Sequence, residues 1–289
     1  MSRSDLISEL GSATALVDEE QLHLDLNDGT RIPQLGLGVY KTPADETAEI
    51  VRYAARTGYR MVDTAAFYGN ESGVGDALQD FPDLYVSTKL WASDMGYDSA
   101  LRAFDESARK LRRDVVDLYL IHWPMPKKNL YVESWKALIE LRKQGRVRSI
   151  GVCNFEPEHL TRLIEETGVK PVLNQIELHP AFQQKELRAF NDALDIRTEA
   201  WSPLGRGTGL DGEIITSIAK KHGKTPGQVT IRWHLELGNV VIPKSAHHKR
   251  IDENFDVFDF RLDDEDMARI ATLDRADGRT GPDPATADF

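Results

Sequence analysis

The sequence lacks the features of secreted, disulfide-linked and membrane-spanning proteins. Its single cysteine, Cys153, excludes a disulfide within the chain and fits a reducing compartment. No apolar run approaches the roughly 20 residues needed to cross a bilayer. The first residues carry acids without a continuous apolar stretch, so no signal peptide is predicted. We therefore expect a cytoplasmic protein without a membrane partner.

The chain also lacks an excess of basic residues. Its net charge is -11, which argues against nucleic acid as the main partner. What it does have is 289 residues, of which 40% are hydrophobic and 29% charged, enough for a sizeable core. This length permits two domains of average size or one α/β barrel, which typically needs about 250 residues.

Two segments precede the regular part of the chain. Residues 1–20 are small, polar and acidic, and we expect an N-terminal tail that is either disordered or carries one short helical face. Between His23 and Ile32, Asn27-Asp28-Gly29 separates two short alternating runs, which predicts a β-hairpin.

From residue 35 onward, predicted strands and helices alternate. The predicted strands are 35–40, 60–63, 85–89, 115–122, 147–152, 172–177, 196–200 and 239–242. The predicted helices are 43–57, 71–78, 99–111, 132–143, 156–167, 184–193, 212–222, 226–236, 247–254 and 264–273. Alternation of this kind implies parallel strands joined by right-handed crossovers. We therefore expect residues 21–289 to form a single α/β domain, a closed (β/α)8 TIM barrel with an N-terminal β-hairpin, extra C-terminal helices and an irregular flap after Arg275.

Polar residues stand at or just past the ends of the predicted strands. They are Asp63, Lys89, His122, Asn154, Gln175, Glu177, Ser202 and Lys244. Because active sites of such barrels lie at the C-terminal ends of the strands, this set is expected to line one mouth.

Four titratable residues near this mouth suggest acid–base chemistry. A buried Asp63 needs a cation, for which Lys89 is the candidate. Tyr68 follows Asp63 by five positions, and a nearby cation would lower its pKa from about 10, which favours it as a proton donor. A satisfied ion pair and an ordinary buried His122 would explain any one of these residues alone, but three successive strands ending in titratable groups favour a site.

Two other interpretations use some of these four residues. The first is a short-chain dehydrogenase. Gly69–Gly75 and the pair Tyr85 and Lys89 match motifs of short-chain dehydrogenases. However, the Tyr85 segment is predicted as a strand, in which residues four apart are separated by about 13 Å and do not couple. Gly36–Lys41 lacks the last glycine of the dinucleotide fingerprint, so no Rossmann fold is predicted.

A metal site is the second of these interpretations. Glu177 and His179 alternate and, with Asp63 and His122, would supply a ligand set. Lys89 would place an ammonium in the same small space, so no metal is expected.

The ordered motifs of the chain resemble the aldo-keto reductase family from about His23 to the C-terminus. The segments that carry the resemblance are 58–65, 68–71, 88–91, 117–124, 150–155, 174–180 and 242–245. Segments 201–205 and 256–260 look most like bacterial diketogluconate reductases. The resemblance implies an NADPH-dependent oxidoreductase that reduces aldehydes or ketones to alcohols, with keto-sugar acids and α-dicarbonyls as candidate substrates. A monomer is expected from the same likeness.

The resemblance also implies a role for each of the four titratable residues. Tyr68 would donate a proton to the carbonyl oxygen as hydride reaches the carbonyl carbon. Lys89 would stabilise the developing tyrosinate, Asp63 would hold Lys89, and His122 would position the carbonyl. Acid catalysis of this type is worth about 10²–10⁴-fold. A non-catalytic, NADPH-binding, redox-sensing subunit is the alternative, because such a subunit can retain all four residues.

Cofactor and substrate contacts follow from the same resemblance. The implied cofactor contacts are Asn154 and Gln175 with the carboxamide, Trp201 with the nicotinamide, Ser202, Leu204 and Gly205 with the pyrophosphate, Lys244, Ser245 and Arg250 with the adenosine phosphate, and Glu253 and Asn254 with the adenine. The implied walls of the substrate pocket are Tyr40, Phe67, Trp91 and Trp123. One departure is Cys153, where the family usually has Ser; a thiol is the weaker hydrogen-bond donor.

Overall fold

The computed structural model describes residues 23–289, so the predicted tail at residues 1–20 lies outside the described residues. A hairpin of β1 (His23–Asp25) and β2 (Arg31–Pro33) comes first. Eight parallel strands follow in chain order, each paired with its neighbour in the sequence. They are β3 (Leu37–Gly38), β4 (Met61–Asp63), β5 (Tyr85–Leu90), β6 (Val116–Ile121), β7 (Val147–Cys153), β8 (Leu173–Glu177), β9 (Arg197–Trp201) and β10 (Val240–Val241).

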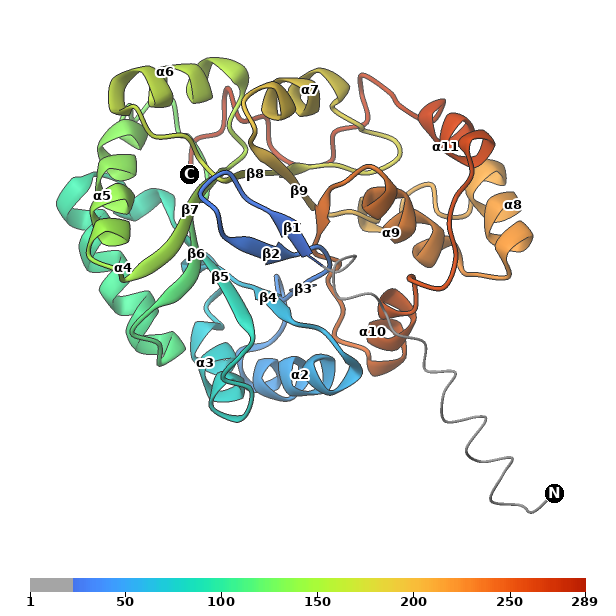
Figure 1. The fold of residues 1–289 in the computed structure, drawn as a ribbon, viewed down its shortest axis with the longest axis horizontal. Helices are drawn as coiled ribbons and strands as arrows, with labels where there is room; N and C mark the ends of the chain where they lie inside the picture. The colour runs from blue at the N-terminus through green and yellow to red at the C-terminus, as the bar shows by residue number, and fades with distance from the viewer. Residues whose placement is uncertain (1–22) are drawn as a thin grey trace.

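The sheet curls until its first and last strands meet. The Gly36 amide donates to Val241 O at 2.9 Å, and the Val241 amide donates to Gln34 O at 2.9 Å. The chain there also forms parallel bridges between Leu35 and Val241 and between Gly38 and Lys244. The predicted (β/α)8 barrel and its hairpin are therefore confirmed, and Figure 1 shows the helices arranged around the strands.

The helices lie close to their predicted positions. They are α2 (Ala44–Thr57), α3 (Glu71–Asp80), α4 (Tyr97–Leu111), α5 (Tyr131–Lys143), α6 (Pro157–Thr167), α7 (Lys185–Ala193), α8 (Glu213–His222), α9 (Pro226–Glu236), α10 (His248–Phe255) and α11 (Asp264–Ala271). Helix α2 is typical, since its buried Ile50, Val51 and Ala54 recur at helical spacing. Helix α9 begins with a capping box in which the Thr225 side chain accepts a hydrogen bond from the backbone N–H of Gln228. No helix among residues 23–289 is long and apolar enough to cross a membrane.

The hairpin closes the end of the barrel where the strands begin. Leu26 and Ile32 are buried against interior residues that include Met61 and Leu118. The side-chain Nδ2 of Asn27 also donates to Pro171 O at 2.9 Å, just before β8. Figure 1 shows β1 and β2 lying across this end of the barrel. The barrel is therefore sealed and apolar at one end, which leaves the C-terminal ends of the strands for a site.

Candidate active site

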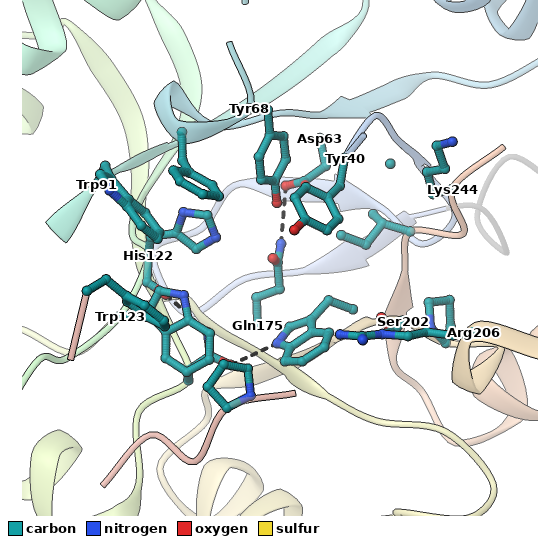
Figure 2. Close-up of a pocket in the computed structure, with 18 residues that line it drawn as sticks. Tyr40, Asp63, Tyr68, Trp91, His122, Trp123, Gln175, Ser202, Arg206 and Lys244 are labelled. Atoms are coloured by element: carbon teal, nitrogen blue, oxygen red, sulfur yellow. Dashed lines mark hydrogen bonds between the residues drawn. The ribbon is translucent and has the colours of Figure 1, made fainter. Parts of the chain in front are cut away.

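A cavity of about 400 Å³ occupies the mouth formed by the C-terminal strand ends. Its lining is Gly38, Tyr40, Asp63, Phe67, Tyr68, Trp91, His122, Trp123, Asn154, Gln175, Trp201, Ser202, Pro203, Arg206, Ile242, Lys244, Pro282 and Phe289. In Figure 2, Trp91, His122 and Trp123 lie at one end of the cavity, Arg206 and Lys244 lie at the other, and Tyr68 lies between them. The cavity thus has an aromatic end and a cationic end.

A buried ion pair lies beneath this cavity. Lys89 Nζ, on β5, is 2.6 Å from Asp63 Oδ1 on β4, and the two side chains are 0% and 2% exposed. Lys89 Nζ also donates to Thr64 O at 2.8 Å, and the Ser87 hydroxyl donates to the second oxygen of Asp63. Burial by itself lowers the pKa of Lys89, but the adjacent Asp63 carboxylate raises it, and the net pKa lies above its ordinary value. Lys89 is therefore an ammonium ion at any physiological pH.

Tyr68 lies directly above the ion pair, on the 3-10 turn η2 (Ala66–Tyr68) that follows β4. Its ring centroid is 5.1 Å from Lys89 Nζ. Burial raises the pKa of Tyr68 above its ordinary value, and Lys89 offsets only part of that rise. The expectation that Lys89 lowers this pKa overall is therefore wrong, because desolvation of the phenolate outweighs the attraction of the ammonium. The phenol consequently keeps its proton until a group that develops negative charge approaches it.

His122 follows β6 and faces the same part of the cavity. Its ring lies edge-on to Tyr68, with centroids 5.7 Å apart, and edge-on to Trp91 at 5.1 Å. Burial, and then the charge of Lys89, hold the pKa of His122 well below its ordinary value. A neutral imidazole can donate one hydrogen bond but is a poor proton donor.

Two amides complete the polar floor of the cavity. Asn154 has a left-handed φ of 61°; its Nδ2 donates to His122 O at 3.0 Å, and its Oδ1 accepts from Trp201 Nε1 at 2.8 Å. Gln175 Nε2 donates to Asp63 Oδ2 at 3.1 Å and to Glu199 Oε2 at 2.9 Å. Because both amide hydrogens of Gln175 are used, its oxygen is the atom left for a ligand. Cys153 is fully buried, and burial raises the pKa of its thiol well above the ordinary value, so this thiol is not a nucleophile.

The remaining predicted cofactor residues lie toward and beyond the cationic end. Ser202 and Lys244 line the cavity, whereas Leu204, Gly205 and Ser245 do not. Arg250, Glu253 and Asn254 lie on α10, outside the lining. Within the described part of the chain, Lys244 and Arg250 are exposed and neither forms an ion pair, so both charges are available to an anion.

The predicted aromatic walls line the cavity together with residues that the sequence analysis missed. Phe67 stacks on Trp91 with centroids 3.9 Å apart, and Tyr40 packs against Tyr68 at 4.9 Å. The missed residues are Gly38, Pro203, Arg206, Ile242, Pro282 and Phe289. Phe289 lies 5.5 Å from the Trp91 ring, and a lone aromatic in a polar tail is the signal that could have revealed it. Arg206 has a left-handed φ of 56° in a glycine-rich turn, for which the sequence offered no signal.

Glu177, proposed above as one member of a metal-ligand set, anchors the C-terminal strap, residues 272–289, which has no helix or strand. Its Oε1 accepts from the Thr280 amide at 2.7 Å and from His179 Nε2 at 3.2 Å, and its Oε2 accepts from the Gly281 amide at 2.9 Å. Burial favours the neutral acid, yet these hydrogen bonds together lower the pKa of Glu177 to about 2. Among residues 23–289, no three or more His, Cys, Asp or Glu side chains are grouped to hold a metal ion.

Comparisons with known proteins match nearly all of the described chain. A family model described as the aldo/keto reductase family matches residues 33–275. An aldo-keto reductase of Mycolicibacterium smegmatis is 56% identical over 270 residues, which are 92% of this chain and 98% of that protein. Methylglyoxal reductase DkgA of Escherichia coli K12 is 51% identical over 267 residues, which are 90% and 96% of the two chains.

Solved structures also match this chain over most of its length. A mutant of Gox0644 in complex with NADPH has a TM-score of 0.91 and 59% identity, and the match covers 92% of this chain and 98% of that one. A Bombyx mori aldo-keto reductase in complex with NADP has a TM-score of 0.82 and 36% identity, and the match covers 87% and 92% of the two chains.

The Glu177 contacts predict a pH-dependent contribution to stability. The folded pKa of about 2 lies below the ordinary value of 4.5, so the contribution is complete above about pH 4.5 and is lost as the pH falls toward 2. We expect Glu177→Gln to lower the free energy of unfolding by about 2–3 kcal/mol at pH 7, and by less at pH 3.5. Urea unfolding at both pH values measures this difference. Glu213→Gln, at an exposed glutamate on α8, is the matched control and should change neither value. An equal loss for Glu177→Gln at pH 7 and pH 3.5 would show that the charge of Glu177 does not hold the strap.

Proposed function

Because the chain belongs to the aldo/keto reductase family, we propose that it is an NADPH-dependent enzyme that reduces the carbonyl group of small aldehydes and ketones, with Tyr68 as the proton donor. One observation carries the assignment of Tyr68: the buried Lys89–Asp63 ion pair lies directly beneath a protonated phenol at the centre of the cavity. The same cavity gives a carbonyl compound access to Tyr68 and His122.

The residues present fit NADPH. The free oxygen of Gln175 suits the amide hydrogens of a carboxamide, and Asn154 retains one N–H to donate. The hydrogen bond to Asn154 orients Trp201, whose flat indole face suits a planar ring. Lys244 at the cationic end and Arg250 on α10 suit a phosphate dianion. When bound there, NADPH supplies the hydride that reduces the carbonyl carbon.

The chain's own residues supply the proton for the carbonyl oxygen and stabilise the negative charge that is left on Tyr68. As negative charge develops on the carbonyl oxygen, Tyr68 Oη donates its proton to that oxygen. Lys89 stabilises the resulting tyrosinate, and Asp63 keeps Lys89 oriented. His122 stays neutral and donates a hydrogen bond that positions the carbonyl, because delivering its only N–H proton would leave an imidazolate. The raised pKa of Tyr68 keeps the phenol protonated before the substrate binds.

The substrate class is proposed from the two ends of the cavity. Trp91 and Trp123 at the aromatic end suit flat carbonyl compounds and sugar rings. Relatives are named methylglyoxal reductases, so α-dicarbonyls are the first candidates and keto-sugar acids the second. NADPH consumption with a panel of aldehydes, α-dicarbonyls and keto-sugar acids tests the proposal. NADPH binding without consumption across the panel would contradict it and favour a non-catalytic, redox-sensing subunit.

The proton-donor assignment predicts different losses for two substitutions. Tyr68→Phe removes the transferable proton and should lower kcat by at least about 10²-fold. NADPH binding, followed by quenching of Trp fluorescence, should persist. His122→Gln should keep measurable turnover with a raised substrate KM, because Gln still donates a hydrogen bond. If Tyr68→Phe keeps most of its turnover and His122→Gln is inactive, the two roles are reversed.

Arg250 predicts the preference for NADPH over NADH. Removal of its charge by Arg250→Ala should raise the KM for NADPH about tenfold, since a charge-assisted contact contributes about 1–3 kcal/mol. The KM for NADH should hardly change. Arg261→Ala, at another exposed arginine without an ion pair in the described chain, is the control and should affect neither cofactor. Equal losses for both cofactors in Arg250→Ala would refute recognition of the phosphate by Arg250.

A further inference from the structure

A second buried carboxyl group, Glu199, lies in the polar layer beneath the cavity. On β9 its side chain alternates with those of its neighbours, so it shares a face with Trp201. Strand register places it beside Gln175 on β8 and Val240 on β10. Its residue exposure is 0%, although a glutamate in an apolar interior is rarely tolerated without a partner.

The hydrogen bonds of Gln175 connect Glu199 to the site. Gln175 Nε2 is 2.9 Å from Glu199 Oε2 and 3.1 Å from Asp63 Oδ2, so one amide links the two carboxyl groups. Figure 2 shows Gln175 extending from the cavity floor toward Asp63. The other oxygen of Glu199 has no hydrogen-bond partner within the described chain. Glu199 does not line the cavity, and its hydrogen bond to the site runs through Gln175.

The electrostatic surroundings favour the neutral form of Glu199. Burial and then the negative charge of Asp63 raise the pKa of Glu199 to about 8, against the opposing effects of the Gln175 hydrogen bond and of Lys89. The other titratable groups that face it are Tyr85 on β5 and Cys153 on β7, and burial holds the pKa of both well above their ordinary values. Glu199 therefore loses its proton as the pH rises through about 8, whereas burial favours the neutral forms of Tyr85 and Cys153.

We propose that Glu199 is a positioning residue for the reaction proposed above: it fixes Gln175, and through Gln175 Asp63, and its proton makes turnover depend on pH. The inference rests on that proposed function. When Glu199 ionises, a second carboxylate faces Lys89, so Lys89 stabilises a tyrosinate less well. Tyr68 then gives up its proton less readily. The consequence is a fall in the rate of carbonyl reduction as the pH rises through about 8.

The test compares pH profiles of kcat/KM for a carbonyl substrate at saturating NADPH. Glu199→Gln keeps the acceptor for Gln175 but cannot ionise. We expect the wild type to lose rate above about pH 8 and the variant to keep it, so that the ratio of variant to wild type rises at least about fivefold between pH 7 and pH 9.5. Asp117→Asn neutralises another buried carboxyl, which accepts from the Val86 amide on the neighbouring strand, and its profile should follow the wild type. Superimposed profiles for Glu199→Gln and the wild type overturn the proposal.

A second measurement does not need turnover. Since the folded pKa of Glu199 lies above the ordinary value of 4.5, the wild type should lose stability relative to Glu199→Gln as the pH rises from about 5 to 8, and no further above that. The Tm of Glu199→Gln minus that of the wild type should therefore increase over this range; a constant difference contradicts the proposal. If Glu199→Gln does not fold, Glu199→Met, which fills similar space without a charge, takes its place in both measurements. If the wild type reduces no carbonyl compound, the proposed function fails, and the Tm gap still decides whether Glu199 titrates.

Discussion

The ion pair between Lys89 and Asp63 is the interaction on which the rest of the mouth depends. Two charges without solvent cost several kcal/mol each, and their attraction offsets this only when further hydrogen bonds satisfy both groups. Those bonds come from Thr64, Ser87 and Gln175, so β4, β5 and β8 must keep a fixed register. The ammonium that results opposes a charge on His122 and attracts charge on Tyr68. The ammonium thus adds to the effect of burial in keeping His122 neutral, and opposes the effect of burial on Tyr68.

The two ends of the barrel differ: one end is packed with apolar side chains, and the other carries the polar side chains of the cavity. At the end where the strands begin, the hairpin closes the interior with apolar side chains such as Leu26 and Ile32. At the other end, polar side chains replace this apolar packing, and the strap anchored by Glu177 covers part of the opening. Because the strap carries Pro282 and Phe289 into the cavity wall, its anchoring bears on which substrates fit.

The sequence was informative where local pattern determines structure. The predicted ranges lie within a few positions of every α-helix in residues 23–289, and polar strand ends pointed to the mouth. Strand β3 was predicted at 35–40 but pairs regularly only over Leu37–Gly38, since neighbouring residues there close the barrel through single bridges. Properties set by tertiary packing were missed. The pKa of Tyr68 depends on how deeply a loop is buried. Phe289 enters the cavity from the C-terminal strap, and Glu199 is conspicuous only once the barrel closes around it.

We propose that the chain retains the Lys89–Asp63 pair for turnover rather than for stability. A double-mutant cycle with Asp63→Asn and Lys89→Met, measured by urea unfolding and by NADPH-dependent turnover, tests it most directly. Each single variant should lose about 3–5 kcal/mol of stability, whereas the double variant should recover most of that loss, because no unpaired buried charge remains. Turnover should stay at least about 10²-fold below wild type in all three. Wild-type turnover in the double variant, or single variants as stable as the wild type, would contradict the account.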